Sequence, residues 1–150
     1  MPLTAHPNES VEAIQKSSDL TALTSKCWAE IFMFFHSLRP PPSSTIAVFE
    51  PTPGFEPVVT NVLSPDEYSK VSSPLKPMTV SEYKTKGLVY FHPLSSIGKS
   101  LTVLVPLHVD GTAFIEGKSI NTDSYYHVFR QSNIEVSENG RLAALVILYK

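Results

Sequence analysis

Two residues in one strand-like run have side chains that could move a proton. Residues 124–130 read Ser-Tyr-Tyr-His-Val-Phe-Arg, so Tyr125 and His127 occupy alternate positions, which share one face of a strand. A neutral imidazole takes or gives a proton near pH 7, and a tyrosine hydroxyl can donate to a substrate carbonyl or enolate oxygen. We predict His127 as the acid/base residue and Tyr125 as the oxyanion donor. The alternative readings are a core or half-exposed strand histidine and a tyrosine that packs with its hydroxyl at the rim.

Two further candidates for acid/base chemistry come from other strand-like runs. His108 lies opposite the apolar face of residues 101–109, and it becomes a neighbour of His127 if that other face lines a pocket. Glu50 ends the apolar run 46–49, where a carboxylate at an apolar mouth is suited to general acid or base catalysis. The alternatives are a solvent-facing histidine near a turn and an ordinary strand-end acid beside Pro51.

Aromatic residues supply the candidate substrate-binding surface. A long helix is predicted from Ser18 or Asp19 to Arg39, because apolar residues recur at steps of three and four and Pro40 ends the run. The predicted binding residues are three aromatic side chains that widen this stripe and two residues at the end of the His127 run: Trp28, Phe32, Phe35, Phe129 and Arg130. Core packing is the alternative for the aromatic residues, and Cys27 on the stripe is interpreted as a buried apolar residue.

Composition and motifs exclude several classes of function. Twelve Lys and Arg against fourteen Asp and Glu give a net charge of −2, which argues against binding to nucleic acid or an anionic membrane. The sequence contains no Gly-rich phosphate loop, no Gly-x-Ser-x-Gly and no His-Glu-x-x-His, so we expect neither a cofactor nor a metal. A single cysteine and a polar N-terminus without an apolar core indicate a reducing, cytoplasmic location.

The order of predicted elements indicates an α+β fold. A short helix containing Val11 and Ile14 precedes the long helix, and strands over 45–50 and 55–62 then form a hairpin. Short helices are expected from Ser64 and from Thr79 or Ser81, and long strands over 101–109, 124–130 and 141–149 follow. Helices before strands favour a long helix laid across one curved antiparallel sheet, a cone with an apolar end that can hold a small molecule.

The strongest short turn signal in the chain is Asn139-Gly140, which predicts a hairpin between the last two strands. A two-residue turn there places Glu138 opposite Arg141 and Arg130 opposite Tyr149. A slip of one residue would exchange the two faces of the hairpin, so which face lines the pocket stays open.

The closing third resembles a known family. Residues 121–130, Asn-Thr-Asp-Ser-Tyr-Tyr-His-Val-Phe-Arg, followed by Asn139-Gly140-Arg141-Leu142, resemble the SnoaL-like polyketide cyclase branch of the nuclear transport factor 2-like superfamily. The resemblance implies one cone-shaped domain over residues 1–150, with 1–7 as a loose tail. It also implies an acid/base pocket, although the acidic residue that the branch often has on its last strand is replaced here by Leu148-Tyr149-Lys150.

These observations predict a cofactor-free isomerase, cyclase or dehydratase (the last being a lyase) that acts on a hydrophobic polyketide- or terpenoid-like molecule of secondary metabolism. The alternative, favoured by the missing acid, is a non-catalytic module of the same fold that binds a small molecule or a protein. A plain oligomerisation domain is a third reading. Low charge (17% of residues) with 42% apolar residues suits a buried subunit contact, so we expect a homodimer.

Overall fold

The computed structural model describes residues 10–73, 82–98 and 101–149 as ten strands and three helices. The predicted tail over residues 1–7 and the predicted helix start at Thr79 or Ser81 lie outside these ranges. In chain order, the elements are β1 (Val11–Gln15), α1 (Ser18–Phe35), β2 (Ile46–Phe49), α2 (Phe55–Val62), α3 (Pro65–Tyr68), β3 (Tyr83–Phe91), β4 (Leu94–Ile97), β5 (Thr102–Asp110), β6 (Ala113–Ile115), β7 (Lys118–Ser119), β8 (Ser124–Val128), β9 (Ser132–Val136) and β10 (Arg141–Tyr149).

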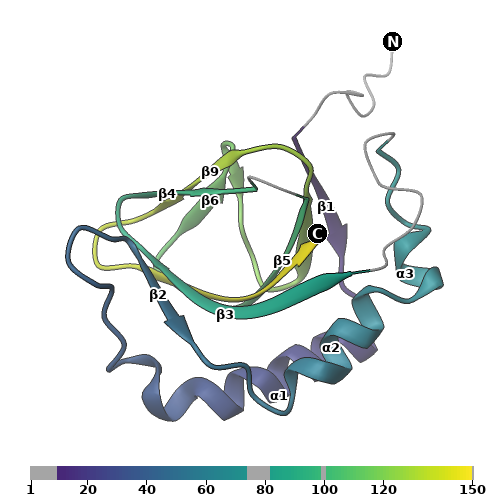
Figure 1. The fold of residues 1–150 in the computed structure, drawn as a ribbon, viewed down its shortest axis with the longest axis horizontal. Helices are drawn as coiled ribbons and strands as arrows, with labels where there is room; N and C mark the ends of the chain where they lie inside the picture. Colours follow the sequence, from purple (N-terminus) through teal and green to yellow (C-terminus); the bar gives the residue numbers. More distant parts are fainter. Residues whose placement is uncertain (1–9, 74–81, 99–100, 150) are drawn as a thin grey trace.

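The strands form two antiparallel sheets with the order of a jelly roll (Figure 1). One sheet has the order β1-β8-β5-β10-β3-β2 and the other the order β4-β9-β6-β7. From β3 to β10 the pairing is nested, since β3 pairs with β10, β4 with β9, β5 with β8 and β6 with β7. Residues 83–149 therefore behave as one long hairpin that is rolled up into two facing sheets, the arrangement of a double-sheet jelly roll.

The tip of this rolled hairpin is a tight turn between β6 and β7. Ile115 pairs with Lys118, so Glu116 and Gly117 alone form the loop. Both have positive φ, 47° and 80°, as a type I′ turn requires. Glycine carries the larger angle at no steric cost, and the side chain of Glu116 accepts a hydrogen bond from the backbone of Asn133 on β9 at 2.7 Å.

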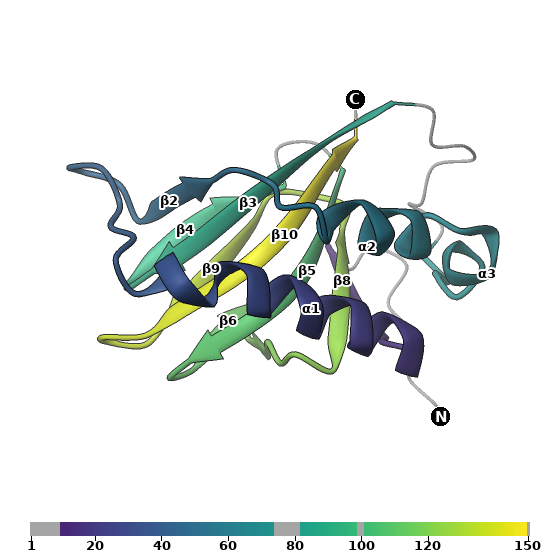
Figure 2. The ribbon, with the colours of Figure 1, turned by 90° about the horizontal axis from the view of Figure 1, so that it is seen from below.

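The six-stranded sheet lies between two apolar layers. α1 and α2 cover its outer face, and the four-stranded sheet faces its other side (Figure 2). β10 contributes to both layers: Ala143, Leu145 and Ile147 pack in the core beneath the helices, whereas Leu142 and Val146 pack in the core between the sheets. The nearly uninterrupted apolar run of β10 therefore reflects a central strand that is buried on both faces.

The expected class, α+β with antiparallel sheets, is confirmed, but the single curved sheet of the cone is replaced by two sheets. The turn at Asn139 forms, with φ of 63°, yet the strands on either side of it belong to different sheets. Arg141 pairs with Asp110 and Phe91 instead of Glu138, and Tyr149 pairs with Tyr83 instead of Arg130. A short turn defines a close approach of two strands and does not require that they share a hydrogen-bond ladder.

At three places the structure has a helix where a strand was predicted, or a strand where a helix was predicted. Residues 55–62 form α2, because Phe55, Val58, Val59 and Val62 make a buried helical stripe, and Pro57 lies in the first turn, where a missing amide hydrogen costs little. β1 replaces the first short helix, since it adds to the sheet beside β8. β3 occupies residues 83–91, where the short helix expected from Thr79 or Ser81 would continue.

A buried lysine joins three of these elements. Lys16 lies between β1 and α1 and is 7% exposed, and its ammonium donates to the hydroxyl of Thr24 on α1 at 3.0 Å and to the carbonyl of Pro106 on β5 at 2.9 Å. Next to Pro106, β5 shifts register against β10, so that Leu107 has no partner residue there. Burial lowers the pKa of Lys16 to about 8, with a smaller opposing effect of Asp123.

This shift predicts how stability depends on pH. Between about pH 8 and 10.5 the unfolded chain keeps the Lys16 proton while the folded protein loses it, so the free energy of unfolding rises with pH in that window. A shift of this size corresponds to about 3 kcal/mol. Urea unfolding of the wild type and of Lys16→Met across this pH range measures the effect. The difference between their free energies of unfolding isolates Lys16, because the contributions of the other titrating groups cancel. A difference between the two proteins that stays constant with pH would contradict the assignment.

Candidate functional site

The C-terminal half of α1 and the end of β5 bring together several predicted residues. Trp28 stacks on the His108 imidazole with ring centroids 3.9 Å apart and planes 7° apart. Phe32 and Phe35 contact the Trp28 ring edge-on, at 5.6 and 5.0 Å. The structure therefore places two of the predicted binding residues, Trp28 and Phe35, against the predicted catalytic residue His108, and Phe32 packs on Trp28.

His108 is oriented by a carboxylate. Its Nε2 donates to Oδ1 of Asp110 at 2.7 Å, and Nε2 of His36 lies 3.9 Å from Oδ2 of the same carboxylate. Nearby, the guanidinium of Arg141 donates to the Phe35 carbonyl at 3.1 Å and lies over the rings of Phe35 and Phe91. A carboxylate–imidazole pair that is partly open to solvent can exchange a proton with a bound molecule.

Tyr125 and His127 belong to a second group, beneath α3. The Tyr125 hydroxyl donates to Oε1 of Glu67 at 2.8 Å, and Lys70 binds Oε2 of that carboxylate at 2.7 Å. Burial, and then the bond to Glu67, raises the pKa of Tyr125, so its hydroxyl keeps its proton. His127 is 1% exposed and is packed between the rings of Tyr68, Tyr125 and Phe129.

The two predicted histidines are not neighbours. His127 pairs with Val103 on β5, and His108 lies five residues further along that strand, about 17 Å at the usual rise per residue. Phe129, half-buried, packs beside His127, whereas Arg130 and Glu50 are exposed. Neither of these two charged side chains has a hydrogen bond or an ion pair to any residue of the described ranges.

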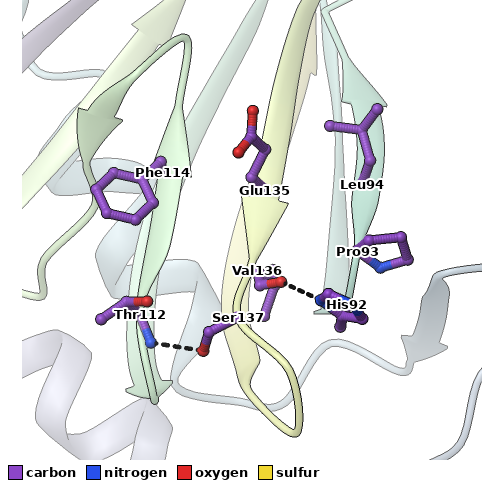
Figure 3. Close-up of a pocket in the computed structure, with 8 residues that line it drawn as sticks. All are labelled: His92, Pro93, Leu94, Thr112, Phe114, Glu135, Val136 and Ser137. Carbon is purple, nitrogen blue, oxygen red and sulfur yellow. Dashed lines mark hydrogen bonds between the residues drawn. The ribbon is translucent and has the colours of Figure 1, made fainter.

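The outer face of the four-stranded sheet carries a groove of about 360 Å³ (Figure 3). Three of its side chains form a row on adjacent strands, since Leu94 on β4 pairs with Glu135 on β9 and Glu135 pairs with Phe114 on β6. Leu94 and Phe114 are 48% and 38% exposed. The remaining lining residues are His92, Pro93, Thr112, Val136 and Ser137.

Hydrogen bonds hold the residues at one end of the groove. Nδ1 of His92 donates to the Val136 carbonyl at 2.8 Å, and the Thr112 amide donates to the Ser137 hydroxyl at 3.0 Å. Figure 3 shows these two pairs at one end and Glu135 between Phe114 and Leu94 further along. The carboxylate of Glu135 has no hydrogen bond and no ion pair within the part of the chain that the structure describes.

Sequence reasoning missed this groove. Residues 132–136, Ser-Asn-Ile-Glu-Val, alternate buried and exposed positions, a pattern that predicts a strand with Glu135 outward. The hairpin predicted at Asn139-Gly140 would pair these residues with the last strand, but β9 pairs with β4 and β6 instead. Register across three strands then brings Leu94 and Phe114 beside Glu135, and no local pattern predicts that pairing.

Two further hollows lie elsewhere on the described surface. One, of about 280 Å³, lies between α2 and β3, and another, of about 460 Å³, lies along β1 beside Lys70. Neither is lined by a predicted catalytic residue. Within the described ranges, no group of three His, Cys, Asp or Glu side chains could hold a metal ion, and no helix is long and apolar enough to cross a membrane.

Comparison with known proteins does not support the expected family. No protein-family model and no curated protein matches the chain. Among solved structures, a prolyl-4-hydroxylase from Pseudomonas putida is similar, with a TM-score of 0.56 and 8% sequence identity over 95% of this chain and 93% of that chain. At that identity the likeness describes the fold alone.

The resemblance to the nuclear transport factor 2-like superfamily and its SnoaL-like branch is therefore wrong. The motifs that suggested it, an aromatic strand and an Asn-Gly turn before an apolar last strand, also occur here, but in two facing sheets. Such motifs describe strands and turns, which many antiparallel folds share.

The Glu67 group makes a prediction about stability. Tyr125→Phe leaves a buried carboxylate oxygen without its hydroxyl donor, so the free energy of unfolding should fall by about 2 kcal/mol. Tyr149→Phe is the matched control, because the Tyr149 hydroxyl is buried and has no partner in the described residues; it should cost less than about 0.5 kcal/mol or stabilise the protein. Urea unfolding measures both variants. Equal losses of unfolding free energy in the two variants would show that the hydrogen bond between Tyr125 and Glu67 does not stabilise the protein.

Proposed function

We propose that the protein is a non-catalytic binding domain that holds a small amphipathic molecule in the groove on the outer face of the four-stranded sheet. The observation that carries the proposal is the row Leu94, Glu135, Phe114, in which two exposed apolar side chains flank an unpaired carboxylate. A groove of about 360 Å³ is within the usual size range of ligand sites, which combine apolar walls with a few polar groups.

The environment of the predicted catalytic pair supports binding over catalysis. Tyr125 and His127 are 0% and 1% exposed, and the Tyr125 hydroxyl already donates to Glu67. Because a general acid or base must reach its substrate within hydrogen-bond distance, these two residues are better explained as the polar and aromatic packing that attaches α3 to the sheet.

Chemical-shift mapping tests the binding proposal. A panel of small amphipathic molecules is added to ¹⁵N-labelled protein, and binding should shift amide signals of β4, β6 and β9. Phe114→Ala, which removes the exposed ring, should weaken binding by about tenfold, whereas Val48→Ala changes an exposed residue on the other sheet and should leave it unchanged. Shifts that fall outside these three strands, or equal affinity of both variants, would contradict the proposal.

The bond between His108 and Asp110 favours a second candidate function. The carboxylate orients a partly exposed imidazole beside Trp28, Phe32 and Phe35, so His108 could remove a proton next to the carbonyl of a hydrophobic ketone in cofactor-free isomerisation.

Exchange of deuterium from D₂O into a panel of small hydrophobic ketones tests this second function. The protein should accelerate the exchange, His108→Asn should reduce the acceleration by about a hundredfold, and Asp110→Asn should reduce it less. Circular dichroism checks that both variants are folded. Exchange that is no faster than in buffer, or is unaffected by His108→Asn, would contradict acid/base catalysis at this cluster.

A further inference from the structure

We propose that the groove selects a small organic cation, an ammonium ion attached to an aromatic or aliphatic body. This inference rests on the proposed binding function and adds the chemical class of its ligand. It follows from three features of the groove: the unpaired carboxylate, the hydrogen-bonding state of the other polar groups, and the aromatic ring beside them.

The first feature is the charge of Glu135. Among the described residues, this carboxylate is the only acidic side chain that lines the groove, and no described Lys or Arg lines it. No cation of the described chain pairs with it. An exposed carboxylate between two apolar side chains attracts a cation and repels an anion, and the low polarity of its neighbours strengthens the attraction relative to an open surface.

The second feature is that the polar groups of the groove offer mainly acceptors. His92 uses Nδ1 to donate to the Val136 carbonyl, so a neutral imidazole keeps Nε2 as an acceptor. The Ser137 hydroxyl accepts from the Thr112 amide and keeps one donor hydrogen. An ammonium group, which has donors and no acceptor, complements a lining rich in acceptors better than a carboxylate or phosphate would.

The third feature is the apolar surface on either side of Glu135. Phe114 presents an exposed ring, which attracts a cation at its face and packs against an apolar body. Leu94 and Pro93 form the opposite wall. A ligand with its charge at Glu135 and its body along Phe114 or Leu94 satisfies all three features, whereas a small inorganic cation would leave both walls exposed.

The experiment compares three probes of similar shape by NMR titration of ¹⁵N-labelled protein: 2-phenylethylammonium, 2-phenylethanol and 3-phenylpropanoate. The ammonium should bind at least threefold more tightly than the alcohol, and the carboxylate should bind most weakly. Glu135→Gln keeps the shape of the side chain and removes its charge. It should weaken ammonium binding by about two- to fivefold, the upper part of the range for an exposed charge interaction, and leave the alcohol unchanged.

The outcomes separate this inference from the binding function. If the alcohol or the carboxylate binds at β4, β6 and β9 as tightly as the ammonium, the groove is a binding site and cation selectivity is wrong. If no probe shifts these strands, the binding function itself is contradicted. A lysine amide that is acetylated on its α-nitrogen keeps its side-chain ammonium and represents a lysine within a protein. If it binds more tightly than 2-phenylethylammonium, the groove recognises a protein side chain and the choice of a free small molecule is overturned. If 2-phenylethylammonium binds Glu135→Gln as tightly as it binds the wild type, the carboxylate does not select the cation.

Discussion

The constraint on which the structure depends is that its central strand, β10, is buried on both faces. β10 pairs with β3 over its whole length and with β5 over most of it. Its side chains alternate between the core beneath the helices and the core between the sheets. Because neither face can meet water without exposing a row of apolar side chains, both a helical layer and a second sheet must be present. α1 and α2 supply the first, and rolling of the hairpin from β3 to β10 supplies the second.

This division of layers assigns different roles to the polar residues. On the helix side, Lys16, Glu67 and Tyr125 are buried and bonded to neighbouring elements, so they hold β1, α1 and α3 against the sheet. None of the three helices that the structure describes lies over the outer face of the four-stranded sheet, and there Glu135 lies beside exposed Leu94 and Phe114. A polar group that is already satisfied contributes to stability, whereas an unpaired one on an uncovered face is free to bind a ligand.

Local patterns predicted elements better than their pairing. α1, α3 and the strands around β5, β8 and β10 follow from apolar spacing, capping residues and β-branched composition. The topology was not predictable in this way, because the turn at the tip of the rolled hairpin, Glu116-Gly117, has a weaker signal than Asn139-Gly140, which connects the two sheets. His108 on β5 and the aromatic residues Trp28, Phe32 and Phe35 on α1 were predicted separately. Packing of α1 on the sheet brings them into one cluster. The groove depends on the register of three strands, which sequence periodicity does not determine.

The central claim is that the uncovered sheet face binds an organic cation through Glu135, and a crystal structure of the protein soaked with 2-phenylethylammonium tests it most directly. The account predicts density in the groove with the nitrogen within hydrogen-bond distance of the Glu135 carboxylate and the ring against Phe114 or Leu94. Density only at another surface, or a ligand in the groove with its nitrogen turned away from Glu135, would contradict the account.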